Sequence, residues 1–283
     1  MDRPVLGLPS AASAAEPSLR AYGDASVAGI RAEGASTTWL TLRAASVVGS
    51  RHRLAGEGSD DFFAWSYREG WAALAVADGL GGVPGSAGAA ARACRAAVSA
   101  ESLYGLEGPE VQSADLASTA TLCGQAAESA ALGGGATTLV LGLISSGGWL
   151  HVVRVGDSSA FVVDAQGTRE LFPAREDGAV GTATAALPFD VPDGESGAER
   201  HVADSAAERW ETASGRLHPG EVLVLATDGV ADPWRDGPGT VEPALRAAIA
   251  GLPSPLDLAG LVDFSRQGCH DDRTVLCAWL RPG

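Results

Sequence analysis

The sequence contains no lysine, so arginine alone supplies strong positive charge. Its 20 arginines face 35 acidic residues, which gives a formal net charge of −15. Nucleic-acid binding depends on basic surface that contacts phosphates, so this balance argues against nucleic acid as the main partner. The same balance suits a soluble protein, or one that concentrates cations.

Other familiar patterns are also missing. The four cysteines form no Cys-x-x-Cys pair and the five histidines form no His-Glu-x-x-His motif, which argues against a zinc site and favours a reduced cytosolic chain. No apolar run reaches the roughly 18–20 residues that a membrane helix needs. The first residues lack the basic and apolar blocks of a signal peptide. We therefore expect a cytoplasmic protein without a membrane partner, and we expect it to be a monomer.

The hydrophobic pattern predicts strands, then helices, then strands again. Apolar runs predict strands at 39–48, 62–67, 71–77, 133–144, 149–157, 158–172 (two strands and a turn), 220–229 and 273–280. Helices are expected at 86–101, within 111–131 and, as two short ones, within 240–264. Short connections between successive strands favour antiparallel pairing. The order fits helices packed on antiparallel sheets, which is an α+β fold, and not a regular βαβ repeat.

Three segments are weakly patterned. Residues 1–36 are small and polar, and we expect a flexible N-terminal extension there. The glycine-rich stretch 49–61 is expected to be a loop. The stretch 174–216 is rich in Gly, Ala, Asp and Glu, and loops of this length in compact domains are usually functional or mobile.

Six aspartates lie where apolar strands meet loops: Asp60, Asp61, Asp78, Asp157, Asp228 and Asp271. The core behind a strand end holds such a side chain in place. Charged groups near a core are costly unless they are paired or bind a metal, and oxygen-only ligands favour Mg²⁺ or Mn²⁺. The alternative is that they are turn and cap residues, since Asp-Gly is a common turn sequence. For any one of them that alternative stays open.

The segments around these aspartates resemble motifs of the metal-dependent protein phosphatase family, the protein phosphatase 2C type, as found in bacteria. The matching segments, in the family's order, are "SDDFFAW", "VADGLGG", "GGGATTLVLGLI", "VRVGDSSAFVV", "VLATDGVAD" and "HDDRTVL". The resemblance implies a four-layer αββα sandwich of two antiparallel β-sheets flanked by helices. It makes 37–283 the catalytic domain, with the site at one edge of the sandwich and a variable flap at about 174–216.

The resemblance also implies a set of metal ligands at the matching positions: Asp60, Asp61, Asp78, Gly79, Asp157, Asp228 and Asp271. Asp78 would bridge two ions, and the carbonyl of Gly79 would contact one of them. Asp228 and Asp271 would hold the other ion, and the acidic pair before residue 62 would act largely through bound water. Asp157, with Asp228, would serve a possible third position. The implied cofactor is therefore Mn²⁺ or Mg²⁺, as two ions with a possible third.

The implied reaction is hydrolysis of phosphoserine or phosphothreonine on a phosphorylated protein, as in signal transduction. A hydroxide bridging the metals would attack phosphorus in line, and no covalent enzyme intermediate is implied. Three departures bear on substrate binding and not on the metals. Gly56 stands where the family usually has a phosphate-binding arginine, Leu80 stands where many members have a histidine, and the glutamate common after the glycine pair is missing.

The only basic cluster in the same stretch is Arg51, His52 and Arg53, and we expect one of them to bind the substrate phosphate. A solvated basic turn is the alternative. Two other functions stay open: a catalytically weak or inactive regulatory binding module with the same fold, and a hydrolase of small phosphoesters.

Overall fold

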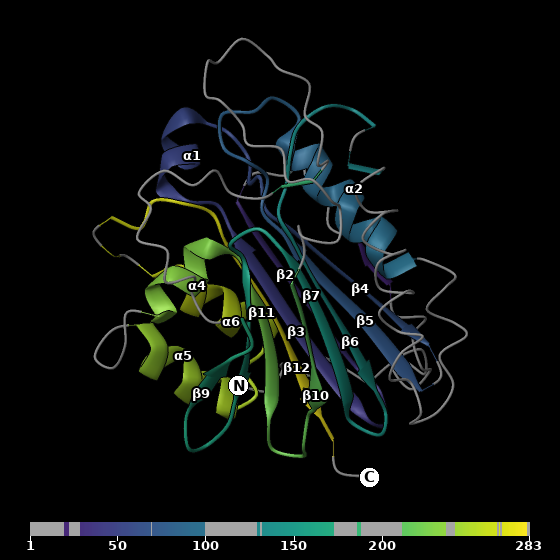
Figure 1. The fold of residues 1–283 in the computed structure, drawn as a ribbon. Coiled ribbons are helices and arrows are strands. Elements are labelled where there is room, and N and C mark those ends of the chain that lie inside the picture. The colour runs from purple at the N-terminus through teal and green to yellow at the C-terminus, as the bar shows by residue number, and fades with distance from the viewer. Residues whose placement is uncertain are drawn as a thin grey trace, which may run out of the picture.

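Two antiparallel sheets form the centre of the molecule (Figure 1). The computed structural model describes residues 20–22, 29–68, 70–99, 129–130, 132–172, 186–187, 211–235, 241–264, 266 and 268–281. The first sheet has the strand order β1 (Arg20–Tyr22), β4 (Phe62–Arg68), β5 (Trp71–Ala77), β6 (Leu139–Ser145), β7 (Trp149–Val155), β10 (Glu211–Arg216). The second has the order β2 (Ile30–Ser36), β3 (Leu40–Val47), β12 (Arg273–Leu280), β11 (Val222–Ala226), β8 (Ser159–Val163), β9 (Thr168–Glu170).

Helices cover both outer faces of the sandwich. They are α2 (Ser86–Ser99), α4 (Asp228–Arg235), α5 (Val241–Ala250) and α6 (Pro255–Val262), and the short helix α1 (Ser50–Ala55) follows β3 at the edge of the sandwich. Helix α2 packs on β4, β5 and β6, whereas α4 and α6 pack on the second sheet, as Figure 1 shows. This is the expected four-layer αββα arrangement. In the described part of the chain, no helix has the length and apolar character needed to cross a membrane.

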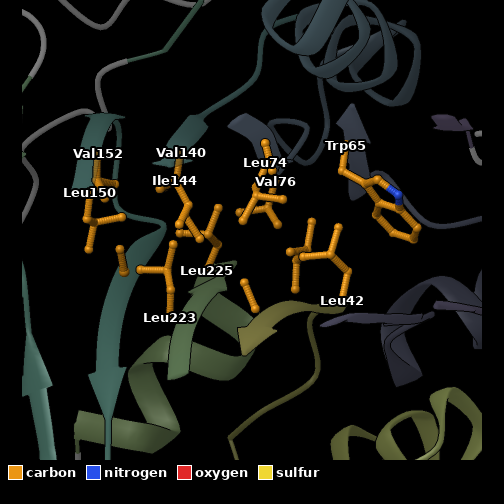
Figure 2. Packing of buried hydrophobic residues seen from close by; sticks show 14 of the residues in the cluster. Leu42, Trp65, Leu74, Val76, Val140, Ile144, Leu150, Val152, Leu223 and Leu225 are labelled. Atoms are coloured by element: carbon orange, nitrogen blue, oxygen red, sulfur yellow. The ribbon is translucent and has the colours of Figure 1, made fainter. Parts of the chain in front are cut away.

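The main core lies between the two sheets. Figure 2 shows Leu74 and Val140 of the first sheet facing Leu42, Leu223 and Leu225 of the second. Each of these five side chains is no more than 1% exposed. Burying one such side chain contributes about 1.5–3 kcal/mol, so the core fixes the two sheets relative to each other. The loops at the strand ends therefore start from fixed positions.

Strand register brings the predicted aspartates to one edge of the sandwich. In the first sheet Phe62 pairs with Ala77, so the start of β4 lies beside the end of β5. In the second sheet Ala226 pairs with Val275, so the end of β11 lies beside the start of β12. The strand ends that precede or follow the aspartates are thus neighbours in space.

Two boundaries differ from the expected ones. Residues 30–36 form β2, an edge strand paired with β3, and residues 20–22 pair with β4, so the sandwich begins before residue 37. Residues 211–216 form β10, an edge strand paired with β7, so the last part of the expected flap belongs to a sheet. Edge strands face solvent, and β10 has no buried side chain that would give it an apolar pattern. The rest of the expected flap, apart from 186–187, and the helix expected within 111–131, apart from 129–130, lie outside the described residues.

Two helices occur where no helix was expected. Within the stretch 49–61, which we expected to be a loop, Ser50–Ala55 form α1. Gly56 ends α1 with φ 72°, a left-handed conformation that favours glycine. Helix α4 begins directly at Asp228, whose carboxylate lies at the positive end of the helix dipole.

Candidate metal centre

Three carboxylates meet at the edge of the sandwich. Asp78 follows β5, Asp157 follows β7, and Asp228 lies between β11 and α4. One carboxylate oxygen from each lies within 4.8 Å of the others. Three residues that are far apart in the sequence therefore provide a set of oxygen ligands that could hold one cation.

The backbone of Asp78 is held by two threonines that precede β6. The Asp78 N–H donates to Thr138 Oγ1 (3.0 Å), and the Asp78 carbonyl accepts from the Thr138 N–H (2.8 Å) and from Thr137 Oγ1 (2.9 Å). Thr138 Oγ1 also lies 2.8 Å from the hydroxyl of Ser158, the residue after Asp157. The small-Thr-Thr segment thus ties the Asp78 loop to the Asp157 loop.

Asp61 links the two sheets at the same edge. Its side chain is buried, and its Oδ2 accepts from the hydroxyl of Thr227 (2.8 Å), the residue before Asp228. That hydroxyl oxygen in turn accepts from the backbone N–H of Thr274 (3.0 Å). Asp61 therefore sits where β4, β11 and β12 converge, next to the other carboxylates.

The Asp-Gly-Leu-Gly-Gly loop packs tightly against its neighbours. The Gly79 N–H donates to the Asp60 carbonyl (3.1 Å). A Cβ on Gly79 would lie 2.7 Å from the Ser86 carbonyl carbon and 2.9 Å from the Asp60 carbonyl oxygen. Only glycine fits this space, which keeps the loop close to the acidic pair before β4.

Burial and mutual repulsion raise the pKa values of the central carboxyl groups. Burial raises the pKa of Asp78 well above its usual range, and the charges of Asp61 and Asp228 raise it further. Burial also raises the pKa of Asp61, with Asp272 as the next cause. For Asp228, burial and the charges of Asp157 and Asp271 raise the pKa to about 7. A bound cation would oppose these shifts.

The residues present fit a divalent cation. In the described part of the structure, Asp61 Oδ1 and Asp228 Oδ1 are buried and have no hydrogen-bond partner. A buried carboxylate oxygen without a donor is costly, and a cation would satisfy it. The donors are carboxylate oxygens, a set that suits Mg²⁺ or Mn²⁺ better than zinc or copper. The charge of Asp271, just before β12, contributes to the raised pKa values of both Asp78 and Asp228.

Asp272 organises the corner of the site beside α1. It is 2% exposed, and its Oδ1 accepts from the Gly49 N–H (2.7 Å). Its Oδ2 accepts from the Asp60 N–H (2.7 Å) and lies 3.0 Å from His52 Nδ1. The Nε2 atom of the buried His52 ring faces Asp60, 3.8 Å from Oδ2. Burial alone would lower the pKa of His52, but the negative charges and hydrogen bond of its acidic neighbours raise it.

The basic cluster of α1 divides into three environments. His52 is enclosed with Asp272. The guanidinium of Arg53 points to Asp263, at 2.7 Å, after α6. The exposed Arg51 borders the Asp-Gly-Leu-Gly-Gly loop: its Nη1 would lie 3.9 Å from a Cβ on Gly81. Arg51 is thus the arginine of this cluster that borders the loop of Asp78.

Sequence reasoning missed the residues that position the carboxylates. Asp271 was predicted as a ligand, but no role was predicted for its neighbour Asp272. The supporting roles of Thr138, Ser158 and Thr227 were not predicted either. For two of them there was a weak indication in the sequence, since Ser158 directly follows Asp157 and Thr227 directly precedes Asp228. Gly56 has a local explanation as well: it ends α1 in the left-handed region, so the usual position of the arginine is used as a helix cap.

A family model described as protein phosphatase 2C matches residues 48–250, and the chain belongs to this family. The match covers the stretch from just before α1 to the end of α5. Among curated proteins, none matches the sequence.

Solved structures with the same fold include bacterial phosphatases. The serine/threonine phosphatase PstP/Ppp of Mycobacterium tuberculosis is 20% identical, with 86% of this chain and 100% of that chain covered and a TM-score of 0.55. A structure of the PstP catalytic domain in complex with two manganese ions is 19% identical, with 86% and 99% covered and a TM-score of 0.56. A bacterial serine phosphatase is 17% identical, with 86% and 98% covered and a TM-score of 0.59. At these identities the likeness establishes the two-sheet sandwich alone.

Proposed function

We propose that this chain is a Mg²⁺- or Mn²⁺-dependent phosphatase that hydrolyses phosphoserine and phosphothreonine on proteins. The observation that carries the proposal is the meeting of Asp78, Asp157 and Asp228 at one edge, together with the buried, unpartnered oxygen of Asp228. Such a set of carboxylates has little use in a protein that binds no cation. Family membership supports phosphoester hydrolysis as the chemistry.

The proposed ligands are the residues that the resemblance implied: Asp60, Asp61, Asp78, Gly79, Asp157, Asp228 and Asp271. When bound, divalent cations would acidify water and neutralise phosphate charge. The chain's part is to hold its oxygens still. Thr138 fixes the backbone of Asp78, and Thr227 fixes the carboxylate of Asp61. Ligands held in this way need no rearrangement when cation and substrate arrive.

Arg51 is the proposed phosphate-binding residue. A phosphomonoester brings negative charge to a site surrounded by carboxylates, and a guanidinium suits phosphate oxygens geometrically. Arg51 borders the Asp78 loop, whereas Arg53 pairs with Asp263 and His52 is buried. Leu80 carries no proton to give to the leaving alkoxide, so water at the site is the proposed proton donor.

The second candidate, a regulatory binding module without turnover, is favoured by one observation: Gly56 ends a helix where an arginine was expected. The carboxylate cluster argues against it, because a binding module gains nothing from a cluster of buried carboxylates that repel one another. Hydrolysis of small phosphoesters would use the same cations and residues and would differ only in the shape of the substrate site.

The test is a phosphatase assay on a phosphothreonine peptide with the full chain. Hydrolysis should require Mn²⁺ or Mg²⁺ and should stop with EDTA. Asp78→Asn should lose about 100-fold or more in kcat/KM, about 2.7 kcal/mol of transition-state stabilisation, because a central ligand is weakened. Hydrolysis that survives exhaustive chelation would sink the proposal, and stoichiometric Mn²⁺ binding without turnover would favour the binding module.

Asp164→Asn is the matched control. Asp164 also follows a strand, β8, but its Oδ1 accepts from the backbone N–H groups of Gln166 (2.7 Å) and Gly167 (2.8 Å). An asparagine keeps that acceptor oxygen, so the turn and the activity should be preserved. If both variants lose activity equally, the meeting of carboxylates at the edge has no special role.

A further inference from the structure

The buried carboxylate of Asp272 joins three segments that are remote in the sequence. It accepts from Gly49, which precedes α1, from Asp60, which precedes β4, and it contacts His52 within α1. Asp60 is 212 residues away from Asp272 in the sequence, and Gly49 is 223 residues away. A single side chain therefore sets how the start of α1 and the acidic pair lie against the start of β12.

The contact with the Asp272 carboxylate defines which ring nitrogen of His52 carries a hydrogen. A carboxylate only accepts hydrogen bonds, so His52 must carry its hydrogen on Nδ1, toward Asp272. The Nε2 atom then faces Asp60, with 3.8 Å between it and Oδ2. In this orientation the His52 ring lies between Asp272 and Asp60, whereas its neighbour Arg51 borders the Asp78 loop.

Backbone packing makes the same junction close. A Cβ on Gly49 would lie 2.3 Å from the carbonyl carbon of Asp271, and the Arg51 N–H donates to the His270 carbonyl (3.2 Å). A Cβ on Gly229, after Asp228, would lie 1.9 Å from the Asp272 carbonyl oxygen. The backbone on both sides of Asp272 is thus in contact with α1 and with the segment that carries Asp228.

We propose that Asp272 is a positioning residue that, together with His52, holds α1 and Asp60 in place so that Arg51 borders the Asp78 loop. This proposal rests on the proposed function, because Arg51, the residue that is positioned, is the proposed phosphate-binding arginine. Asp272 contacts neither substrate nor cation in this role. It acts through the backbone of Asp60 and through the ring of His52.

Asp272→Asn is the direct test, because the change keeps the size of the side chain and replaces one acceptor oxygen by a donor. The new NH₂ group would face the N–H of either Gly49 or Asp60. In the metal-free full chain, amide hydrogen exchange of peptides covering residues 49–60 should become about tenfold faster or more, with β5 and β6 unchanged. The dissociation constant of Mn²⁺, measured by calorimetry, should rise about tenfold, as for other partners of metal ligands. With a phosphothreonine peptide, KM should rise more than kcat falls, because Arg51 is displaced.

Asp263→Asn is the matched control. Asp263 also bonds a side chain of α1, that of Arg53, but on its exposed side. The amide hydrogen exchange, Mn²⁺ affinity and kinetics of the Asp263→Asn variant should match those of the unchanged chain. Equal behaviour of Asp272→Asn and the unchanged chain in exchange and Mn²⁺ binding would overturn the proposal. Loss of protection throughout the sandwich strands would do so too, since it would show a general contribution to stability.

A pair of His52 variants tests the same contact independently if Asp272→Asn does not fold. The amide nitrogen of an asparagine can stand where His52 Nδ1 stands, so His52→Asn should keep protection of residues 49–60, whereas His52→Ala should lose it. Equal protection in both variants would overturn the role of the His52–Asp272 contact. Amide hydrogen exchange and Mn²⁺ binding can be measured without turnover, so they test the positioning role even in a chain that does not hydrolyse phosphothreonine. Absence of hydrolysis by the unchanged chain would contradict the proposed function and leave the positioning role standing.

Discussion

Asp228 and Asp272 are two carboxylates at the same edge of the second sheet, and their surroundings are opposite. Asp228 has a buried oxygen with no hydrogen-bond partner, and its neighbours include Asp78 and Asp157. Asp272 has donors on both of its oxygens. Desolvating a carboxylate is costly unless hydrogen bonds or a cation compensate. The difference separates a carboxylate that we propose binds a cation from one that organises the backbone around the site.

The largest expected effect concerns the pH dependence of the metal-free protein. The pKa of Asp228 is raised to about 7, so the folded state binds a proton that the unfolded state releases near its ordinary value of 3.8. Its contribution to stability is therefore full below the unfolded pKa and is lost as pH rises toward the folded pKa. Each pKa unit corresponds to about 1.4 kcal/mol, so the loss amounts to a few kcal/mol between about pH 4 and pH 7. Asp228→Asn should thus be more stable than the unchanged chain at pH 8 and nearly equal to it at pH 4.

Urea unfolding in EDTA at both pH values checks this prediction. Comparing each variant with the unchanged chain at the same pH cancels the titration of groups remote from the substitution. Asp78 is not remote, but the charge of Asp228 raises its pKa, so removing that charge adds to the expected gain of Asp228→Asn at pH 8. Asp272→Asn provides the contrast, because replacing one acceptor oxygen leaves the N–H of Gly49 or of Asp60 without its partner and should destabilise the protein at both pH values. If Asp228→Asn were also destabilising at pH 8, the distinction between the two carboxylates would fail.

A medium effect is expected from Thr138→Val. The change removes the hydroxyl that accepts from the Asp78 N–H and that contacts Ser158. A buried N–H left without a partner costs about 1–3 kcal/mol of stability. Because that N–H belongs to a proposed ligand, Mn²⁺ affinity should fall as well, by about tenfold. Calorimetric titration with Mn²⁺ and urea unfolding measure the two effects.

Thr41→Val separates the two effects. Thr41 is also buried, and its hydroxyl accepts from Arg281 Nε (2.9 Å) at the other end of β3 from α1. Its loss should lower stability and leave Mn²⁺ affinity unchanged. A weaker Mn²⁺ affinity in both variants would mean that affinity follows overall stability and not the local support of Asp78.

The sequence predicted the sandwich because its central strands are short apolar runs. Strands such as β5 and β11 are buried along most of their length, so an apolar run identifies them. The edge strands β2 and β10 were missed because their side chains are largely exposed, and their sequences are accordingly polar and small. The ordered aspartate motifs predicted Asp78, Asp157 and Asp228, which the fold brings together.

The α1 corner could not be predicted in the same way. Its geometry depends on hydrogen bonds from Gly49 and Asp60 to a residue more than 200 positions away, and no local pattern carries that information. The six-residue helix α1 is also too short to show a helical period. Only the folded structure shows that Arg53 pairs with Asp263, whereas Arg51, two positions before it, borders the Asp78 loop.

The smallest effect is expected from Arg53→Ala. Arg53 and Asp263 form an ion pair whose side chains are 47% and 38% exposed. Exposed ion pairs contribute less than about 1 kcal/mol, so stability should change little. Because the guanidinium points to Asp263 and not to the Asp78 loop, KM for a phosphothreonine peptide should stay the same. Arg51→Ala, two residues away on the same helix, should instead raise KM about tenfold, equivalent to about 1.4 kcal/mol of lost binding, without changing the affinity for Mn²⁺. Equal kinetics in the two variants would show that α1 presents no phosphate-binding arginine, and that cations alone capture the phosphate.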